Sequence, residues 1–426
     1  MKLHFRNEYV GKENYSLVLF WIRKFPIFVA VIVGTVSYAE AVRPDRPPTD
    51  PIAFLAPRMR QCRENRFSSL KSTDEDGSID KGFNLLETAS SVVPQGQIVS
   101  VAKNTVKFAW GRMMAELAPQ DKSGSYKRPQ YKFSGYIGQG NFPDEGGGRY
   151  QLYVGNPCPW CHRARLALKV RQIIDDEVGL TYLVDDPVRA SRGGWVFDKK
   201  PGYSDPIFAS NDLRQLYERM SPGFKGRCTA PLLVDSKRKE IISNESSDIV
   251  RMLGTASFGR EDLRLRTAID LYPPDLAKII DETNIWVYEL LNNGVYQCGF
   301  STTQVAYDRA SAGVRRGLER CNDILSNNDF LCGPNFTEAD LRLLPTVLRF
   351  DGSYAPLFRA GGAHLRIRDF PNLHKWLIKC WHDVPGVKDS IDIQDANSSY
   401  YRQLFPLNPG GLIPTAITAK DIGLEA

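Results

Sequence analysis

The chain has 426 residues, of which 42% are hydrophobic and 24% are charged, and its formal net charge is +6. A chain of this length can bury the cores of two domains and carry terminal extensions as well. The positive charge is mild, and no Lys/Arg-rich run is interleaved with aromatic residues. These features argue against nucleic acid as a partner.

The first 66 residues have the pattern of a targeting segment. Their apolar run Phe25–Ala39 is shorter than the roughly 20 residues that a membrane-spanning helix needs. We therefore predict a cleaved segment in residues 1–66 and an organelle location, with a plastid favoured over a mitochondrion. The alternatives are a membrane anchor, which leaves membrane contact open, a secretory or cytoplasmic route, and translation from a start codon upstream of the native one.

Residues 67–149 are predicted to be an N-terminal extension that wraps around the folded part of the chain. A helix is expected near Val101–Leu117. A stretch rich in Lys, Pro and Gly follows it as far as Gly146–Gly148. The extension carries no motif that indicates a particular chemistry.

Residues 150–255 alternate between the patterns of strands and helices. The predicted order is a strand, a helix, a second strand, two strands that form a hairpin, and a closing helix. Their ranges are Tyr150–Val154, about Pro159–Ile174, Leu180–Val184, Pro231–Asp235, Glu240–Ser243 and Glu245–Leu253. This order is typical of the thioredoxin-like fold.

Two further features of this domain point to a functional site. The segment Asp185–Lys225 is longer than a plain connection needs, so we expect it to have a function. Pro231 begins a predicted strand two positions after Thr229. It fits the cis-proline that thioredoxin-like folds place opposite the reactive thiol, and a trans proline on an edge strand is the alternative.

From about Glu261 onward the pattern is helical. Apolar residues recur at spacings of three and four in Ile279–Leu291, Gly317–Leu325 and Leu373–Trp381. Thr337–Asp340 resembles a capping box, with Asp in place of the usual Glu or Gln. We therefore predict an α/β thioredoxin-like domain over residues 150–255, an all-α domain over 261–400, and a tail over 401–426.

Only two of the eight cysteines, Cys158 and Cys161, have a motif-like spacing; the others are predicted to be free thiols in a reducing compartment. Cys158 follows a strand and a turn and precedes a helix, where backbone N–H groups and the helix dipole favour the thiolate. Pro159 lies where a missing N–H costs nothing. Cys161 is one helical turn later and can resolve a mixed disulfide. Cys158 is therefore the candidate nucleophile.

The run Cys158–His162 allows two cofactor interpretations as well. Cys-x-x-Cys-His is the attachment pattern of c-type haem, but haem calls for a helical context without a preceding strand and for a second axial ligand. Zinc usually has four ligands, and only three candidates cluster here. We therefore expect neither haem nor a metal, and we interpret His162 as a solvent-exposed helix residue, not as a base.

A cysteine at a helix start, the APLL and NESS motifs around Pro231 and Glu245, and a helical second domain together resemble a glutathione transferase. The details are similar to the Xi class, the glutathionyl-hydroquinone reductases, over roughly residues 130–400. The resemblance implies glutathione as a co-substrate and a homodimer as the assembly, and it matches Cys158 to the family nucleophile.

The resemblance also implies which residues contact glutathione. Trp195 is expected to lie against glutathione, and Arg227 is expected to be a basic contact. The backbone of Ala230, directly before Pro231, is expected to pair with the cysteinyl unit, and Glu245 and Ser246 are expected to hold the γ-glutamyl end. A carboxylate suits the γ-glutamyl ammonium, and a hydroxyl with helix N–H groups suits its carboxylate. The alternatives are a core aromatic for the tryptophan and a helix-start acid for the glutamate.

On the substrate side, the resemblance matches Tyr296 and, less closely, Tyr354 to tyrosines whose phenols can hydrogen-bond a hydroquinone oxygen. Plain helix packing is the alternative for both. Two departures from the family pattern stand out. Cys161 replaces the usual Ala, as in glutaredoxins and dehydroascorbate reductases, and Leu357–Ala360 replaces the usual His-Phe-Lys-Cys. The first puts a mono-thiol mechanism in question, and the second puts the quinol substrate in question.

Three functions are open at this point. The first is a glutathione-dependent thiol transferase or reductase that removes glutathione from glutathionyl-hydroquinones or related adducts through a Cys158–glutathione mixed disulfide. The second is a glutaredoxin- or dehydroascorbate-reductase-like enzyme that uses both Cys158 and Cys161. The third is a non-catalytic binding protein with the same fold. Ordinary conjugation is disfavoured because it calls for a Ser or Tyr that does not compete with glutathione.

Overall fold

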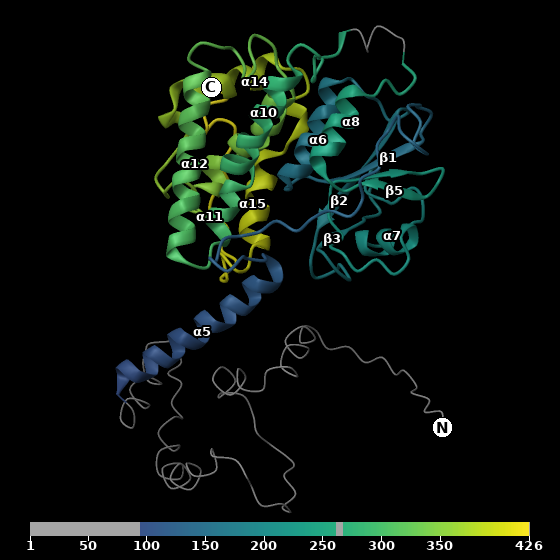
Figure 1. The fold of residues 1–426 in the computed structure, drawn as a ribbon. Coiled ribbons are helices and arrows are strands. Elements are labelled where there is room, and N and C mark those ends of the chain that lie inside the picture. Colours follow the sequence, from purple (N-terminus) through teal and green to yellow (C-terminus); the bar gives the residue numbers. More distant parts are fainter. Residues whose placement is uncertain (1–93, 261–266, 426) are drawn as a thin grey trace, which may run out of the picture. The chain divides into compact units, whose positions relative to one another are not determined.

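The computed structural model describes residues 94–260 and 267–425. The predicted targeting segment with its apolar run Phe25–Ala39 lies outside these residues. The described chain consists of a mixed sheet flanked by helices and, after it, a group of helices (Figure 1). Within this part of the chain, no helix has both the length and the apolar character that crossing a membrane requires.

The sheet has five strands in the order β3-β2-β1-β4-β5. The strands are β1 (Tyr150–Gly155), β2 (Val178–Asp185), β3 (Trp195–Val196), β4 (Leu232–Asp235) and β5 (Glu240–Ser243). The central strand β1 runs parallel to β2 and antiparallel to β4. Nearly all of its residues are buried, because helices cover both faces of a sheet of this kind. The predicted thioredoxin-like domain is confirmed.

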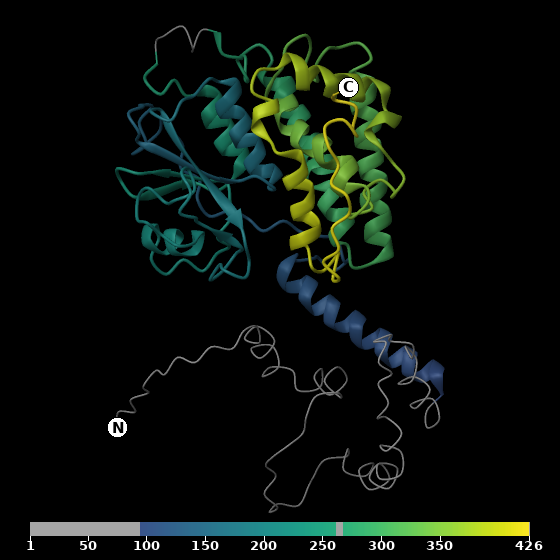
Figure 2. The same ribbon diagram turned by 180° about the vertical axis from the view of Figure 1, so that it is seen from behind.

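Three helices accompany the sheet, namely α6 (Pro159–Val170), α7 (Leu213–Met220) and α8 (Ser246–Thr255). Helices α6 and α8 lie side by side between the sheet and the helical domain (Figures 1 and 2). The long segment Asp185–Lys225 contains strand β3 and helix α7, so part of its length is the crossover from β2 to β4. The peptide bond before Pro231 is cis, as predicted.

The second domain is all-helical, as predicted. Its elements are α10 (Ala277–Val287), the π-helical turn Tyr288–Asn292, α11 (Gly294–Phe300), α12 (Gln304–Ile324), α13 (Glu338–Arg349), the π-helical turn Phe350–Tyr354, α14 (Pro371–Asp383) and α15 (Ile393–Gln403). Short 3-10 turns cover Ile367–Asp369 and Lys388–Ser390. Every residue of α13 except Arg342 is buried. The predicted capping box of Thr337 and Asp340 starts this central helix.

Both flanking segments have structure. The extension begins with α5 (Gln95–Leu117), which starts six residues before the predicted Val101. The rest of the extension bonds first to the helical domain, at Thr302, and then to the sheet domain, at Ile242. The tail lies against α14, where its Leu424 is buried. There Nε2 of His382 donates to the carbonyl oxygen of Leu424 at 2.9 Å. The tail is therefore packed against the helical domain over its last residues.

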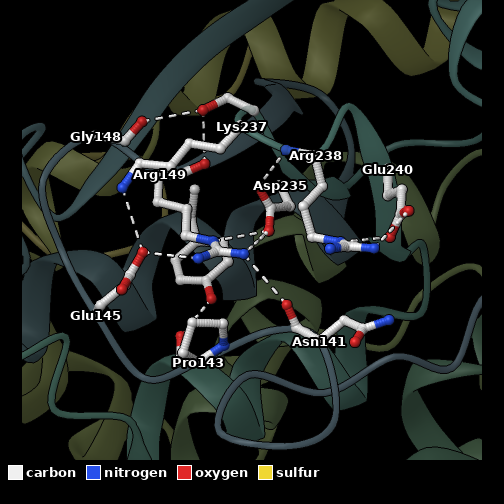
Figure 3. Close-up of polar contacts among 11 residues, drawn as sticks. Asn141, Pro143, Glu145, Gly148, Arg149, Asp235, Lys237, Arg238 and Glu240 are labelled. Atoms are coloured by element: carbon white, nitrogen blue, oxygen red, sulfur yellow. Dashed lines mark hydrogen bonds and ion pairs between the residues drawn. The ribbon is translucent and has the colours of Figure 1, made fainter.

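One anchor of the extension lies at the start of β1, the opposite end of this strand from Cys158. Arg149 bonds Asp235 through Nε at 2.8 Å and Glu145 through Nη1 at 2.7 Å (Figure 3). The side chain of Asp235 is fully buried, and a buried carboxylate calls for such a partner. Arg149 thereby fixes the end of the extension to β4.

Candidate active site

Cys158 lies at the N-terminus of α6, as predicted. It is the N-cap residue, with extended backbone angles, and Pro159 occupies the first helical position. Its half-buried Sγ accepts a hydrogen bond from the backbone N–H of Cys161 at 3.3 Å. The same Sγ lies 3.7 Å from the carbonyl oxygen of Ala230, directly before the cis-proline. The turn after β1 thus presents this thiol to the cis peptide of the neighbouring strand.

The two motif cysteines have opposite electrostatic character. Burial by itself raises the pKa of Cys158, but hydrogen bonds from the side chain and backbone of Cys161, together with the charge of Arg349, lower it below that of an ordinary thiol. Burial and the neighbouring sulfur raise the pKa of Cys161 well above its usual range. Cys158 is therefore the thiolate of the pair, and the fully buried Cys161 stays a thiol that donates to it.

Arg349 connects the helical domain to the turn before the nucleophile. It is fully buried and donates to the carbonyl oxygens of Pro157 at 3.2 Å and Asn156 at 3.1 Å. A guanidinium group has five N–H donors and stays charged. It therefore holds the turn in place and also brings a positive charge close to Cys158. No local motif in the sequence predicts this residue.

The prediction that His162 is exposed to solvent is wrong, because its side chain is fully buried. Its Nδ1 faces Nη1 of Arg349 at 3.0 Å, and its Nε2 lies 2.7 Å from Oγ of Ser390. Since Ser390 donates its own proton to the carbonyl oxygen of Val387, His162 carries its proton on Nε2. Burial and the nearby arginines hold the pKa of His162 well below its usual range. The ring is a neutral structural link and not a base.

Trp195 lies in β3 beside the last residue of β1. A Cβ atom added at Gly155 would lie 2.2 Å from Cζ3 of the Trp195 ring. Only glycine therefore permits the ring to lie over this point of the backbone, directly before the turn that leads to Cys158. Trp195 is half-buried, so one part of its side chain packs against the protein and another part is exposed. That the exposed part contacts glutathione stays a prediction.

Glu245 and Ser246 lie at the start of α8. Glu245 is its N-cap, and the carboxylate accepts from the N–H of Ser247 at 3.0 Å and from Oγ of Ser246 at 3.3 Å. The half-buried Glu245 also lines a hollow of about 410 Å³ together with residues of the extension and of the π-helical turn. The glutamate is thus a helix-start acid and, at the same time, an accessible negative charge at the rim of this hollow.

The structure gives Arg227 a partner that the sequence did not predict. Its guanidinium donates to the carbonyl oxygens of Leu117 at 3.1 Å and Glu116 at 3.2 Å. Free carbonyl groups at the C-terminus of a helix attract cations. Arg227 therefore caps α5, and its predicted contact with glutathione stays a prediction.

Tyr296 and Tyr354 come together, and a third tyrosine, Tyr400, joins them. The hydroxyl of Tyr400 lies 2.7 Å from that of Tyr296 and 2.8 Å from that of Tyr354, which are themselves 3.4 Å apart. Burial raises the pKa of all three phenols, so they stay protonated. The ring of Trp160, two residues after Cys158, stacks on Tyr296 with centroids 6.0 Å apart. This stacking connects the thiol helix to the three phenols.

Tyr400 is the member of this group of phenols that the sequence analysis missed. It belongs to α15, near the end of the helical domain, and it occurs in an ordinary helical pattern, SSYYRQ. No spacing in that stretch distinguishes a phenol that faces a site from one that packs in a core.

The described residues contain no group of three or more His, Cys, Asp and Glu side chains that could hold a metal ion. The seven cysteines in the described ranges are free thiols.

Comparison with known proteins identifies relatives for both domains. Residues 157–256 match the family described as "Glutathione S-transferase, N-terminal domain", and residues 304–378 match "Glutathione S-transferase, C-terminal domain". The chain is 39% identical to Glutathionyl-hydroquinone reductase YqjG of Escherichia coli over 267 residues, which are 62% of this chain and 78% of that protein.

Two solved structures are similar as well. The glutathione S-transferase Xi of Phanerochaete chrysosporium has a TM-score of 0.63 and 36% identity, over 68% of this chain and 97% of that one. The glutathione-bound structure of YqjG has a TM-score of 0.59 and 35% identity, over 70% of this chain and 96% of that one.

Proposed function

The chain belongs to the glutathione S-transferase family, with relatives in its Xi class, and on this basis we propose that it is a glutathione-dependent reductase. Its proposed reaction removes glutathione from glutathionyl-hydroquinones or related adducts through a mixed disulfide at Cys158. One relative supports this choice in two ways, since YqjG of Escherichia coli is described as a glutathionyl-hydroquinone reductase and its matching structure has glutathione bound.

The proposed first step uses the Cys158 thiolate as nucleophile. It attacks the glutathione sulfur of the adduct, so that an S–S bond forms and the C–S bond breaks. The electron pair of the C–S bond leaves with the ring carbon, which takes up a proton and becomes part of the free hydroquinone. A second glutathione thiolate then attacks the mixed disulfide, which yields glutathione disulfide and returns the Cys158 thiolate. In the net reaction two glutathione sulfurs, one of the adduct and one of the free thiol, are oxidised to a disulfide and one ring carbon is reduced.

The observation that carries the proposal is the position of Cys158, whose Sγ accepts from the first turn of α6 and lies beside the cis peptide of Ala230 and Pro231, where its pKa is lowered by these hydrogen bonds and by Arg349. Transferases that conjugate glutathione stabilise its thiolate and need no nucleophile of their own. A protein thiolate at this point would compete with glutathione for the electrophile. A reaction in which the enzyme attacks a glutathione sulfur that already carries a leaving group, in contrast, requires a protein thiolate as nucleophile.

Glutathione is proposed to bind along the elements around this thiol. The backbone of Ala230 pairs with its cysteinyl unit, Trp195 lies against it, and Glu245 accepts from its γ-glutamyl ammonium. The hydroxyl of Ser246 and the free N–H groups at the start of α8 donate to the γ-glutamyl carboxylate. Tyr296 and Tyr354 are proposed to hydrogen-bond the oxygen atoms of the leaving hydroquinone.

A second candidate is a disulfide reductase that resolves the mixed disulfide with Cys161. In that reaction Cys161 attacks Cys158, an internal disulfide forms, and glutathione leaves as a thiol. The position of Cys161 one turn from Cys158 favours this candidate. The burial and the raised pKa of Cys161 oppose this candidate, because the attacking group must be a thiolate.

A non-catalytic binding protein is the third candidate. If it is correct, Cys158 should be alkylated no faster than free glutathione.

The assembly and the location are also proposals. We expect a homodimer, because the family resemblance implies one, and a plastid location, because of the composition of residues 1–66. Light scattering of the purified chain measures the oligomeric state. Fluorescence microscopy of the tagged full-length protein measures its location.

The decisive experiment is intact-mass spectrometry after incubation with glutathionyl-menadione in its reduced, hydroquinone form. The wild type is expected to gain one glutathione at Cys158 while menadiol is released, and Cys158→Ser is expected to do neither. Cys228→Ser is the matched control, since Cys228 is a buried thiol with a raised pKa. Release of menadiol by Cys158→Ser at the wild-type rate would exclude the proposed function.

A further inference from the structure

A second hollow is formed by α5, the loop after the second π-helical turn and the C-terminal tail. Its volume is about 740 Å³, and sites for small molecules commonly measure roughly 300–1,000 Å³. Most of its lining residues lie outside the ranges 157–256 and 304–378 that match the two family models. The hollow is therefore a feature of the extension and the tail more than of the two matched domains.

Side-chain hydrogen bonds hold the walls of this hollow. Nε1 of Trp110 in α5 donates to the carbonyl oxygen of Pro406 in the tail at 3.1 Å. Nδ2 of Asn408 donates to the carbonyl oxygens of Tyr401 at 2.7 Å and Leu412 at 2.8 Å. Three of the lining residues are prolines, whose backbone angle φ is fixed. The walls are thus formed before a ligand binds, which lowers the entropic cost of binding.

The hollow is separate from the three phenols, although the same segments of the chain build both. Phe358 is fully buried and packs on the ring of Tyr400, whereas its neighbours Leu357 and Arg359 line the hollow. In the same way, Tyr400 belongs to the phenols and the next residue, Tyr401, lines the hollow. None of the three phenols lines it, so a ligand bound there does not use the position proposed for the hydroquinone.

Arg359 is the one charged residue among the described residues that line the hollow. Its guanidinium forms no hydrogen bond or ion pair with another residue of the described ranges, and its guanidinium carbon lies 6.0 Å from the ring centroid of Tyr307. Its backbone has a φ of 58°, which is uncommon for a residue other than glycine. The hydroxyl of Tyr307 donates to its carbonyl oxygen at 2.8 Å. The protein thus holds a cation at this hollow and supplies no anion for it.

The rest of the lining is mainly apolar. Leu412 and Ile413 are 79% and 45% exposed, and the rings of Trp110 and Tyr401 are half-buried. Covering apolar surface of this kind stabilises a complex by about 25 cal/mol per Å². No acidic residue is among the described lining residues, so an ammonium group such as that of glutathione finds no partner here.

We propose that this hollow is a second ligand site, which binds small molecules that combine a flat apolar body with one carboxylate or sulfonate group. The acidic group pairs with the guanidinium of Arg359, and the apolar body covers Leu412 and Ile413. Glutathione does not have these properties, because it is polar along its length and carries an ammonium. The inference goes beyond the proposed function and does not depend on it, since it involves neither Cys158 nor the elements around it.

The test compares two fluorescent probes that share one ring system. They are 8-anilinonaphthalene-1-sulfonate and N-phenyl-1-naphthylamine, which lacks the sulfonate. Each is titrated against the full-length protein, and the wild type is expected to bind both. Arg359→Gln is expected to weaken binding of the sulfonate about tenfold, the effect of one charge-assisted hydrogen bond. It should leave the affinity for the uncharged probe unchanged.

Two further variants and one competitor complete the test. Ile413→Ser removes part of the apolar wall and should weaken binding of both probes. Arg309→Gln removes the same charge from an exposed residue of α12 and is expected to bind both probes like the wild type. Saturating glutathione should leave the affinity for the sulfonate unchanged.

Four results overturn the inference. They are a wild type that binds neither probe, an Arg359→Gln variant that binds the sulfonate like the wild type, an equal loss of both probes in that variant, and displacement of the sulfonate by glutathione. The third would indicate a general effect on the fold, and the fourth would place the probe at the glutathione site. Adduct formation at Cys158 is measured separately, so none of these results decides the proposed function.

Discussion

Nη1 of Arg349 donates a hydrogen bond to Nδ1 of His162 over 3.0 Å in the buried interface between the two domains. The imidazole is neutral and carries its proton on the other nitrogen, so it accepts from the arginine without sharing its charge. Nε and Nη2 of Arg349 donate to the backbone of the turn before Cys158. The helical domain thus supplies a fixed positive charge to a nucleophile that belongs to the other domain.

The first prediction concerns this charge. Arg349→Gln is expected to raise the pKa of Cys158, because the thiolate loses a stabilising cation while the helix N–H groups stay in place. In the wild type, the rate of alkylation by iodoacetamide should rise with pH to a plateau, with a midpoint below that of an ordinary thiol because the pKa of Cys158 is lowered. The midpoint of the variant should be higher, and at any pH below both midpoints a midpoint one pH unit higher slows alkylation about tenfold.

Arg368→Gln is the matched control for this measurement, since Arg368 is exposed and bonds the tail at Asp421. Its alkylation profile should coincide with that of the wild type. An Arg349→Gln variant that keeps its fold by circular dichroism and also keeps the wild-type midpoint would show that Arg349 only shapes the turn.

The second prediction concerns Cys161. Replacing it by Ser keeps the backbone N–H bond to Cys158 and exchanges one buried donor for another, so the low pKa of Cys158 should largely persist. We expect Cys161→Ser to retain turnover of both glutathionyl-menadione and a glutathionylated peptide disulfide, because a second glutathione resolves the mixed disulfide. A loss of activity confined to the disulfide substrate would favour the mechanism in which Cys161 is the resolving thiol.

The sequence predicts those parts of the site that belong to local motifs. Cys158 is defined by the strand, turn and proline around it, Pro231 by its place before an apolar strand, and Glu245 by the start of a helix. Arg349 and Tyr400 leave no such signal, because their partners are distant in the chain. Arg349 is 192 residues from Pro157, and Tyr400 is 104 residues from Tyr296. Arg349 reaches its partners through the packing of the two domains, and Tyr400 reaches Tyr296 through the fold of the helical domain.

His162 illustrates the same limit in the opposite direction. A histidine in the first turns of a helix, between residues that face a core, is expected to contact solvent when the sheet domain is considered alone. The helical domain covers this face of α6 and buries the ring. Exposure of a residue at a domain interface depends on the partner domain, which helical periodicity does not report.

The third prediction concerns the start of α13. Asp340 accepts from the N–H groups of Leu331 at 2.9 Å and Thr337 at 3.1 Å and from Nε1 of Trp376 at 3.0 Å. Asp340→Ala leaves these buried donors without an acceptor, and we expect it to lower the free energy of unfolding by about 3 kcal/mol or more. Thermal unfolding followed by circular dichroism measures the loss.

Glu319→Ala is the control for this stability measurement, because Glu319 is exposed on α12. It should change the unfolding midpoint little. If Asp340→Ala unfolds at the wild-type temperature, the capping box does not stabilise the central helix.

The fourth prediction concerns the three phenols. Tyr400→Phe keeps the aromatic packing against Tyr354 and Phe358 but removes the hydroxyl that joins Tyr296 to Tyr354. Because these hydroxyls are proposed to face the leaving hydroquinone, kcat/KM for glutathionyl-menadione should fall about tenfold, the cost of one hydrogen bond in the transition state. The rate of Cys158 alkylation should stay unchanged, since the hydroxyl of Tyr400 is not among the groups that stabilise the thiolate.

Tyr401→Phe is the control. The phenol of Tyr401 donates to the carbonyl oxygen of Gly352, and its loss should leave both rates near their wild-type values. Equal loss in alkylation and turnover for Tyr400→Phe would mean that the phenols support the fold around Cys158 and do not contact the substrate.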